Sequence, residues 1–268
     1  KPLLRAIADS GYNEPTLIQQ RCIPPIIEKK DVIASAQTGT GKTAGFALPI
    51  LQLVFDKQDA PKRGKKARAL IVSPTRELAV QVEEVFKFYN YSLPTPFKIS
   101  SVFGGVSINP QMKGLFGVNI LIATPGRLLE LIRAKALQLF KVNTLVIDEA
   151  DKMLNLGFKE EMNQILELLP KSRQNLLFSA TLSDKIAEIQ DIVLNNPIVV
   201  KIEQKEETVS LIDQTGYFVS EEKKQKILIL QSLLDIRLSS IHPPKTSSNC
   251  RAEAGGVGFP NPSFKLPS

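Results

Sequence analysis

The segment Ala36–Thr43, which reads AQTGTGKT, constrains the fold of this sequence more than any other feature. An apolar run at 31–34 (DVIA) precedes it, and helix-forming residues follow at 44–48 (AGFAL). A strand, a glycine loop and a helix in this order form a phosphate-binding loop. Gly39 and Gly41 allow a tight turn whose backbone N–H groups face anionic oxygens, a charge that the helix dipole also favours. The segment therefore predicts binding of a nucleoside triphosphate.

The last two residues of this loop carry its side-chain chemistry. Lys42 can reach the β- and γ-phosphates of a nucleotide, and the hydroxyl of Thr43 can ligate Mg²⁺. The usual pattern opens with glycine, whereas the first position here is Ala36. An ordinary glycine turn is the alternative interpretation, but the Gly-Lys-Thr ending and the flanking pattern favour a nucleotide site.

The rest of the chain alternates short apolar runs with helix-forming stretches. Strands are expected at 69–73, 98–103, 118–123, 144–147, 174–178 and 198–202. Helices are expected at 3–10, after Thr16, at 184–194 and between strands. Strand and helix in alternation predict an α/β fold, a parallel sheet with helices on both faces. Ligands of such sheets bind at the carboxyl ends of the strands, where the polar clusters of this sequence fall.

Two carboxylates, Asp148 and Glu149, directly follow the apolar run at 144–147. A carboxylate at a buried strand end can hold Mg²⁺ on the β- and γ-phosphates, and the next one can orient or deprotonate an attacking water. A surface turn is the alternative. The position of the acidic pair, two strands along from the phosphate loop, argues against a surface turn.

Two arginines, Arg76 and Arg127, begin expected helices after proline-containing turns. Cations there oppose the helix dipole, so local stability does not explain them. Guanidinium groups beside helix N-termini suit nucleic-acid phosphates, and solvated arginines are the alternative. Because aromatic residues make up only 6% and Trp is absent, no stacking platform is visible. We therefore expect sequence-tolerant contacts to phosphate and sugar.

Composition excludes several other classes of protein. The 268 residues carry a net charge of +7, which permits a polyanionic partner only weakly. Cys22, Cys250 and the single His242 form neither a disulfide framework nor a zinc site, and a reducing cytosol fits them. No apolar run approaches the ~20 residues of a membrane span. No secretory leader opens the chain at Lys1, so a cytoplasmic location is expected.

Together these stretches closely resemble the DEAD-box ATP-dependent RNA helicases. The amino-acid sequence at 44–51 and 102–111 is most similar to bacterial RhlE-type members. In chain order, the matching segments are the Q motif around Gln19, motif I at Ala36–Thr43, motif Ia at Pro74–Ala79, the GG motif at Gly104-Gly105, motif Ib at Thr124–Arg127, motif II at Asp148–Asp151 and motif III at Ser179–Thr181. The resemblance implies a RecA-like P-loop domain that uses ATP and Mg²⁺ and acts on RNA.

The resemblance also implies a role for each matching residue. Nucleotide binding would fall to Tyr12, Thr16, Gln19, Ala36, Gln37, Thr38, Gly39, Thr40, Gly41, Lys42 and Thr43, the first three around adenine. Catalysis would use Lys42, Asp148 and Glu149, with Mg²⁺ on Thr43 and Asp148. Ser179 and Thr181 would couple hydrolysis to strand separation. The RNA backbone would contact Pro74, Thr75, Arg76, Gly104, Gly105, Thr124, Gly126 and Arg127.

The resemblance covers only about 2–234, and motifs IV to VI of a second RecA-like domain, including the arginine finger, have no match. We expect a nucleotide-binding domain at 1–204, a linker and the start of a truncated second domain at 205–235, and an irregular or disordered tail at 236–268 that reads like foreign or frame-shifted sequence. Leu17 stands where the family usually has proline. The family's adenine-stacking aromatic residue would lie before Lys1.

Three functions are compatible with these observations. The first is a DEAD-box helicase whose first domain this is, and which needs a second RecA-like domain in cis or in trans. The second is a catalytically incompetent fragment that binds ATP and RNA without turnover. An arginine finger supplies orders of magnitude in rate, so the missing motifs support this alternative. The third is a DNA translocase with the same core, against which the Q motif and the Asp-Glu-Ala-Asp sequence argue.

Overall fold

The computed structural model describes residues 2–9, 14–56, 67–182, 186 and 193–202. The chain divides into two units, Lys1–Lys205 and Glu206–Ser268, and the second unit lies outside the described residues. The helix expected at 184–194 falls largely outside them as well, and so do the linker and tail expected from 205 onward. Those expectations therefore remain predictions.

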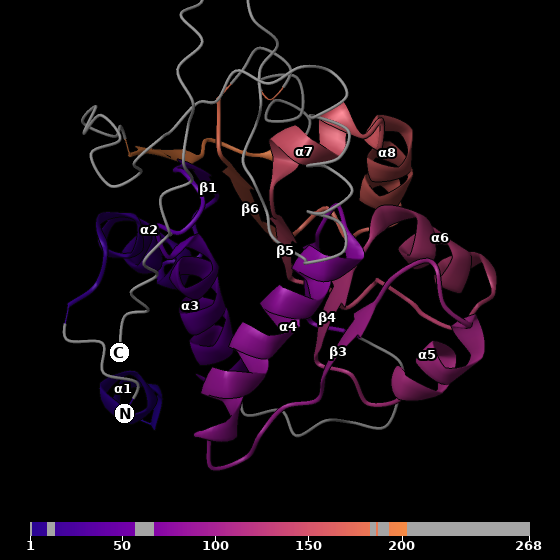
Figure 1. Cartoon of the computed structure of the whole chain (residues 1–268), viewed down its shortest axis with the longest axis horizontal. Coiled ribbons are helices and arrows are strands. Elements are labelled where there is room, and N and C mark those ends of the chain that lie inside the picture. Colours follow the sequence, from indigo (N-terminus) through magenta and orange to yellow (C-terminus); the bar gives the residue numbers. More distant parts are fainter. Residues whose placement is uncertain (1, 10–13, 57–66, 183–185, 187–192, 203–268) are drawn as a thin grey trace, which may run out of the picture. The chain divides into compact units, whose positions relative to one another are not determined.

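A seven-stranded sheet forms the centre of the first unit (Figure 1), and every pairing between its strands is parallel. In sheet order the strands are β3 (Ile99–Val102), β4 (Ile120–Ala123), β2 (Ala69–Val72), β5 (Thr144–Ile147), β6 (Gln174–Ser179), β1 (Val32–Ser35) and β7 (Ile198–Lys201). Each strand expected from the sequence is present, with small shifts at its ends. The predicted parallel α/β fold is confirmed.

Helices connect these strands in the described part of the chain. They are α1 (Pro2–Asp9), α2 (Leu17–Ile27), α3 (Lys42–Asp56), α4 (Arg76–Tyr91), α5 (Ile108–Gly114), α6 (Pro125–Arg133), α7 (Ala150–Asn155) and α8 (Lys159–Glu167). The sequence did not predict α5, α7 or α8. All three helices are short, and α5 buries none of its residues, so each offers at most one or two turns from which an apolar period could be recognised.

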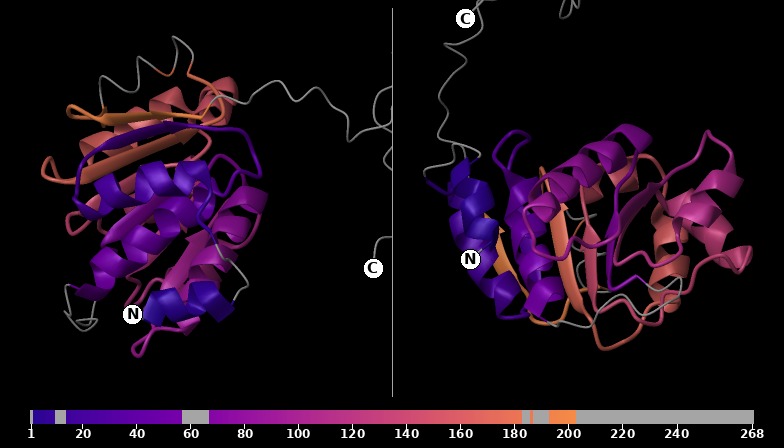
Figure 2. Two further views of the ribbon diagram at one scale, coloured as in Figure 1. Left: turned by 90° about the vertical axis from the view of Figure 1, so that its left-hand side faces the viewer. Right: turned by 90° about the horizontal axis from the view of Figure 1, so that it is seen from below.

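Two apolar cores lie on opposite faces of the sheet, because successive strand residues point to opposite sides. On β1, Val32 and Ala34 pack into the core that contains α2, α3 and α4. Ile33, between them, packs into the core of α6, α7 and α8. The strands β2, β4, β5 and β6 are buried along their whole length, as expected of a parallel sheet covered on both faces (Figure 2).

The strand order decides which loops share a neighbourhood. Since β5, β6 and β1 are adjacent and parallel, the segments that follow them emerge side by side at one edge of the sheet. These segments are the loop after β1, the acidic pair after β5 and the end of β6. The segments after β3, β4 and β2 emerge on the other half of the same edge. This carboxyl-terminal edge holds the candidate site.

Candidate active site

The loop after β1 requires glycine at two places. Gly39 has φ +82° and Gly41 has φ +87°, in the left-handed region that other residues rarely adopt. A Cβ at Gly41 would also lie 2.5 Å from Nε2 of Gln19, whereas one at Gly39 would meet nothing within 4 Å. The Oγ1 of Thr40 donates to the carbonyl of Gln37 at 2.8 Å and closes the turn. Ala36 has no positive φ, so this position accepts alanine.

Lys42 begins α3 and turns its side chain back over the loop. Its Nζ donates to the carbonyl oxygens of Ala36 at 2.6 Å and Ser179 at 3.4 Å, and the residue is only 7% exposed. Burial lowers the pKa of Lys42, and the charges of Asp148 and Glu149 partly offset this. The ammonium group therefore lies between the ends of β1 and β6, facing the acidic pair.

Gln19 joins the start of α2 to the phosphate loop. Its Oε1 accepts from the backbone N–H of Thr16 at 3.0 Å, and its Nε2 donates to the carbonyl of Gly41 at 3.2 Å. The sequence suggested an adenine contact for this amide but did not predict the bond to Gly41. Thr16 is the N-cap of α2, as expected, and Leu17 is an exposed first helical residue. Tyr12 lies outside the described residues.

Asp148 is buried at the end of β5, where its backbone N–H donates to the carbonyl of Val72 at 2.9 Å. Burial, followed by the charge of Glu149, raises the pKa of Asp148 from its ordinary value to about 7, and Lys42 partly opposes this. A carboxylate that is costly to ionise gains from a cation beside it. The donor set fits Mg²⁺, which is commonly held by one or two carboxylates together with phosphates and water.

Glu149 is the N-cap of α7 and has a left-handed backbone, with φ 51° and ψ 51°. For a residue other than glycine this conformation costs on the order of 1 kcal/mol. Glu149 as a residue is 8% exposed. Its Oε2 lies 2.6 Å from Nζ of Lys152, one helical turn further along the chain. The ion pair, which raises the pKa of Lys152, thus holds the side chain that the sequence suggested for water activation.

The end of β6 is bonded directly to the phosphate loop. The carbonyl of Ser179 accepts from the backbone N–H of Ala36 at 3.2 Å as well as from Lys42. The Oγ of Ser179 accepts from the backbone N–H of Thr181 at 3.4 Å. Ser35 Oγ donates to the carbonyl of Ala180 at 3.2 Å. Hydrogen bonds therefore join the phosphate loop and the end of β1 directly to the end of β6 and the residue after it.

On the other half of the edge, the two arginines differ in environment. Arg76 is exposed, and its guanidinium lies 4.9 Å from the ring centroid of Phe103. Arg127 is 7% exposed: its Nε pairs with Glu130 at 2.8 Å, and its Nη2 donates to the carbonyl of Val106 at 2.8 Å. The alternative of a solvated arginine is therefore wrong for Arg127. Its buried Nη1 has no hydrogen-bond partner among the residues that the structure describes.

The remaining residues suggested for RNA contact lie on the same half of the edge. Thr75 caps α4 by accepting from the N–H of Leu78 at 3.3 Å, and Pro74 beside it is buried. Thr124 caps α6 and is 9% exposed. A Cβ added at any of three glycines would meet no atom within 4 Å, so an extended chain could approach their backbone: Gly104, Gly105 and Gly126.

Sequence reasoning missed several residues that hold this site in place. Lys152 and Glu130 each pair with a site residue one helical turn away, a spacing that the sequence does show. Gln111 bonds both the N–H and the carbonyl of Phe103, at 3.1 and 3.0 Å. Glu83 accepts from the N–H and the hydroxyl of Ser101, at 3.1 and 2.7 Å. The last two contacts cross between elements and leave no local signal.

A glycine loop between β1 and α3, with a lysine at its end and a buried carboxylate after β5, defines a P-loop domain of the RecA-like class. Comparison with known families makes the assignment narrower. Residues 16–189 match the DEAD/DEAH box helicase family, and this chain belongs to that family. None of the described helices is long and apolar enough to cross a membrane.

Curated relatives agree. The chain is 43% identical over 235 residues to the DEAD-box ATP-dependent RNA helicase CshA of Streptococcus pneumoniae, and the match covers 87% of this chain and 43% of that protein. It is 41% identical over 236 residues to the ATP-dependent RNA helicase CshA of Listeria monocytogenes, covering 88% and 44%. The chain thus spans less than half the length of these relatives. The narrower likeness to RhlE-type members stays a prediction.

Solved structures show the same fold. A DEAD box protein from Methanococcus jannaschii superposes with a TM-score of 0.70 at 34% identity, over 88% of this chain and 61% of that one. A hypothetical ATP-dependent RNA helicase from Sulfolobus tokodaii superposes with a TM-score of 0.67 at 31% identity, over 75% and 56%. The RecA-like fold expected from the sequence is therefore confirmed.

Proposed function

We propose that this chain is the first, ATP-binding domain of a DEAD-box RNA helicase that couples ATP hydrolysis to separation of RNA strands. The observation that supports this most is the division of the carboxyl-terminal edge into two halves. The phosphate loop and the acidic pair, proposed for nucleotide, follow β1 and β5, and the proposed coupling residues Ser179 and Thr181 lie at the end of β6, whereas the residues proposed for RNA follow β2, β4 and β3. Because β5 neighbours β2, the acidic pair lies where the two halves meet.

In the proposed reaction, the N–H groups of the loop and the ammonium of Lys42 bind the β- and γ-phosphates of ATP. Mg²⁺, when bound, neutralises phosphate charge, and Thr43 and Asp148 are the residues that would hold it. Glu149 orients a water in line with the γ-phosphate and accepts its proton. To do so, its carboxylate must turn from Lys152, with which it pairs at 2.6 Å.

We propose that turnover needs a second RecA-like domain, in cis or in trans. The family resemblance and the length of the relatives support this. An arginine finger from such a domain would stabilise the transition state. The alternative is that this chain binds ATP and RNA without hydrolysis. We also propose a cytoplasmic location, which the buried free thiol of Cys22 supports.

The test is steady-state ATP hydrolysis with and without single-stranded RNA, in the presence and absence of an added second domain from a relative. We expect RNA-stimulated turnover only with the added domain, lost in Lys42→Ala and in Glu149→Gln. Nucleotide binding without turnover under every condition would support the non-catalytic alternative. Competition between RNA and DNA oligonucleotides at one salt concentration separates RNA from DNA specificity, because salt alone shifts such affinities.

A further inference from the structure

Strand β3 is the outermost strand on one side of the sheet, and a side-chain amide holds the chain at each of its ends. Before β3, Asn90 Nδ2 donates to the carbonyl of Phe97 at 2.9 Å, and Asn90 Oδ1 accepts from the N–H of Phe97 at 2.8 Å. After β3, Gln111 Nε2 donates to the carbonyl of Phe103 at 3.0 Å, and Gln111 Oε1 accepts from the N–H of Phe103 at 3.1 Å. We call each arrangement an amide clamp, because one side chain bonds both backbone groups of one residue.

The amide clamp on Phe103 fixes the start of the loop that follows β3. Residues 104–107 of this loop are all exposed. A Cβ added at Gly104 or at Gly105 would meet no atom within 4 Å, so a ligand can approach the backbone closely at both positions. The clamp therefore lies directly beside the open backbone that we propose for RNA contact.

Two further contacts connect this loop to the arginines of the RNA half of the carboxyl edge. Arg127 Nη2 donates to the carbonyl of Val106 at 2.8 Å, which anchors the loop a second time. The ring of Phe103 lies 4.9 Å, measured to its centroid, from the guanidinium of Arg76. Holding Phe103 in place therefore fixes both the start of the loop and the ring beside a cation proposed for RNA contact.

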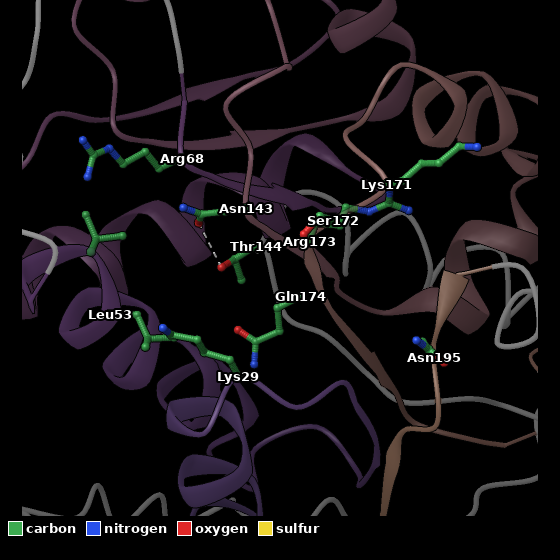
Figure 3. Close-up of a pocket in the computed structure, with 11 residues that line it drawn as sticks. Lys29, Leu53, Arg68, Asn143, Thr144, Lys171, Ser172, Arg173, Gln174 and Asn195 are labelled. Carbon is green, nitrogen blue, oxygen red and sulfur yellow. Dashed lines mark hydrogen bonds between the residues drawn. The ribbon is translucent and has the colours of Figure 1, made fainter.

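Amide side chains that bond the backbone twice also occur where no RNA contact is proposed. At the opposite edge of the sheet, Gln174 lines a cavity of about 430 Å³ (Figure 3), and its Nε2 donates to two backbone carbonyls at 2.9 and 2.8 Å. The side chains of Arg68 and Lys171 extend to opposite sides of this cavity, so its cations do not converge on one point (Figure 3). What distinguishes Gln111 is the open glycine backbone beside the residue that it holds.

The free energy of ordering the loop explains why such a clamp matters for binding. Glycine loses more backbone freedom on ordering than any other residue, so a loop that begins with Gly104 and Gly105 is costly to fix. The clamp on Phe103 orders the start of this loop before a ligand arrives. Preorganisation of this kind increases affinity because less conformational entropy is lost on binding.

We propose that Gln111 is a positioning residue for RNA: it holds Phe103 so that the glycine loop and Arg76 meet the sugar-phosphate backbone in a fixed arrangement. RNA contacts the loop and not the amide of Gln111. The inference rests on the RNA binding proposed above. It adds a residue on α5, beyond the GG motif and outside the segments that the sequence assigned to RNA.

The test compares two variants that each remove one amide clamp. Gln111→Met removes the clamp on Phe103, and the matched control Asn90→Leu removes the clamp on Phe97, which precedes β3 and lies at the opposite edge of the sheet. Both changes replace an amide with an apolar side chain of similar size and leave the net charge unchanged. Fluorescence anisotropy with labelled single-stranded RNA is measured on the full chain. We expect Gln111→Met to weaken RNA binding about fivefold or more and Asn90→Leu to leave it unchanged.

Two further measurements separate the position of the loop from the stability of the fold. Titration with an ATP analogue in the absence of RNA should give one affinity for all chains, because the phosphate loop follows β1 on the other half of the carboxyl edge. Without ligand, amide hydrogen exchange should be about tenfold faster at Phe103 in Gln111→Met and at Phe97 in Asn90→Leu. Gln111→Asn, which keeps the amide on a shorter stem, is the second variant if methionine impairs folding.

The outcomes distinguish this inference from the proposed function. Equal RNA affinity of the unsubstituted chain and Gln111→Met would overturn the inference alone, and so would unchanged exchange at Phe103. Equal weakening by Gln111→Met and Asn90→Leu would also overturn it, because a loss of stability would then explain the effect. Absence of RNA binding by the unsubstituted chain would instead overturn the proposed RNA contacts together with the inference.

Discussion

At the scale of single residues, Gly41 is subject to two separate requirements, one from its backbone angle and one from the side chain of Gln19. The neighbouring Gly39 is subject only to the first, because its Cβ would face open space. This difference makes the pair informative. It separates the strain of a left-handed loop from the displacement of the amide that bonds to it.

We predict that Gly41→Ala destabilises the chain more than Gly39→Ala does. Each change places alanine at a positive φ, with a penalty of about 1 kcal/mol. Only Gly41→Ala also drives a methyl group to 2.5 Å from Gln19 Nε2 and breaks that side chain's bond to the loop. Urea unfolding measures the loss of stability in each variant. Titration with an ATP analogue measures the effect of losing the bond between Gln19 and the phosphate loop. Equal losses in the two variants would show that Gln19 does not brace the loop.

The buried carboxylate of Asp148 predicts a dependence of stability on pH in metal-free buffer. Its pKa rises from the ordinary 3.8 to about 7 in the folded chain, so between these values the folded state binds more protons than the unfolded state. The free energy of unfolding therefore falls as pH rises from about 4 to about 7, by a few kcal/mol from this group. Urea unfolding in EDTA measures it. In Asp148→Asn the fall should shrink, and an unchanged slope would contradict the assignment.

At the scale of elements, α2 and α6 end in the same way, each on a lysine whose backbone adopts the unfavourable left-handed conformation. Both helices close on a left-handed lysine with the same pair of backbone bonds. We predict that Lys29→Gly and Lys135→Gly each raise the free energy of unfolding by about 1 kcal/mol. Urea midpoints at an unchanged m-value measure this. A loss of stability in either variant would mean that the lysine stem packs against the helix end and outweighs the relieved strain.

The elements also show what the sequence could predict. Most of the strands β1 to β7 were predictable because they are apolar runs too short for a helix and bounded by turn residues; β3 is the exception, with two serines between Ile99 and Val102. The short helix α7 was not, since its six residues make less than two turns and its start depends on the left-handed Glu149. The roles proposed for the phosphate loop came from its residue types, its flanking pattern and the family resemblance. By contrast, the bonds of Gln111 and Glu83 to residues of β3 and its following loop depend on tertiary packing, which no local pattern records.

At the scale of the described unit, one sheet carries polar residues at both of its edges. We propose that the carboxyl edge binds nucleotide on one half and RNA on the other. The opposite edge collects cations around a cavity. Because the two halves of the carboxyl edge meet at β5 and β2, a change on one half should affect the other only when both ligands are bound.

We therefore predict that Arg76→Ala weakens RNA binding while leaving ATP binding in the absence of RNA unchanged. Arg76 is exposed and lies 4.9 Å from the ring of Phe103, so its removal should not disturb the core. If it contacts one phosphate, the slope of log affinity against log salt should fall by about 0.7 for a single strand. Lys113→Ala, on α5 and outside the proposed contacts, is the matched loss of charge. Fluorescence anisotropy with a labelled single-stranded RNA across several salt concentrations gives both quantities. If the two variants changed the slope equally, net charge alone would govern binding, and the proposed RNA half of the edge would lose its support.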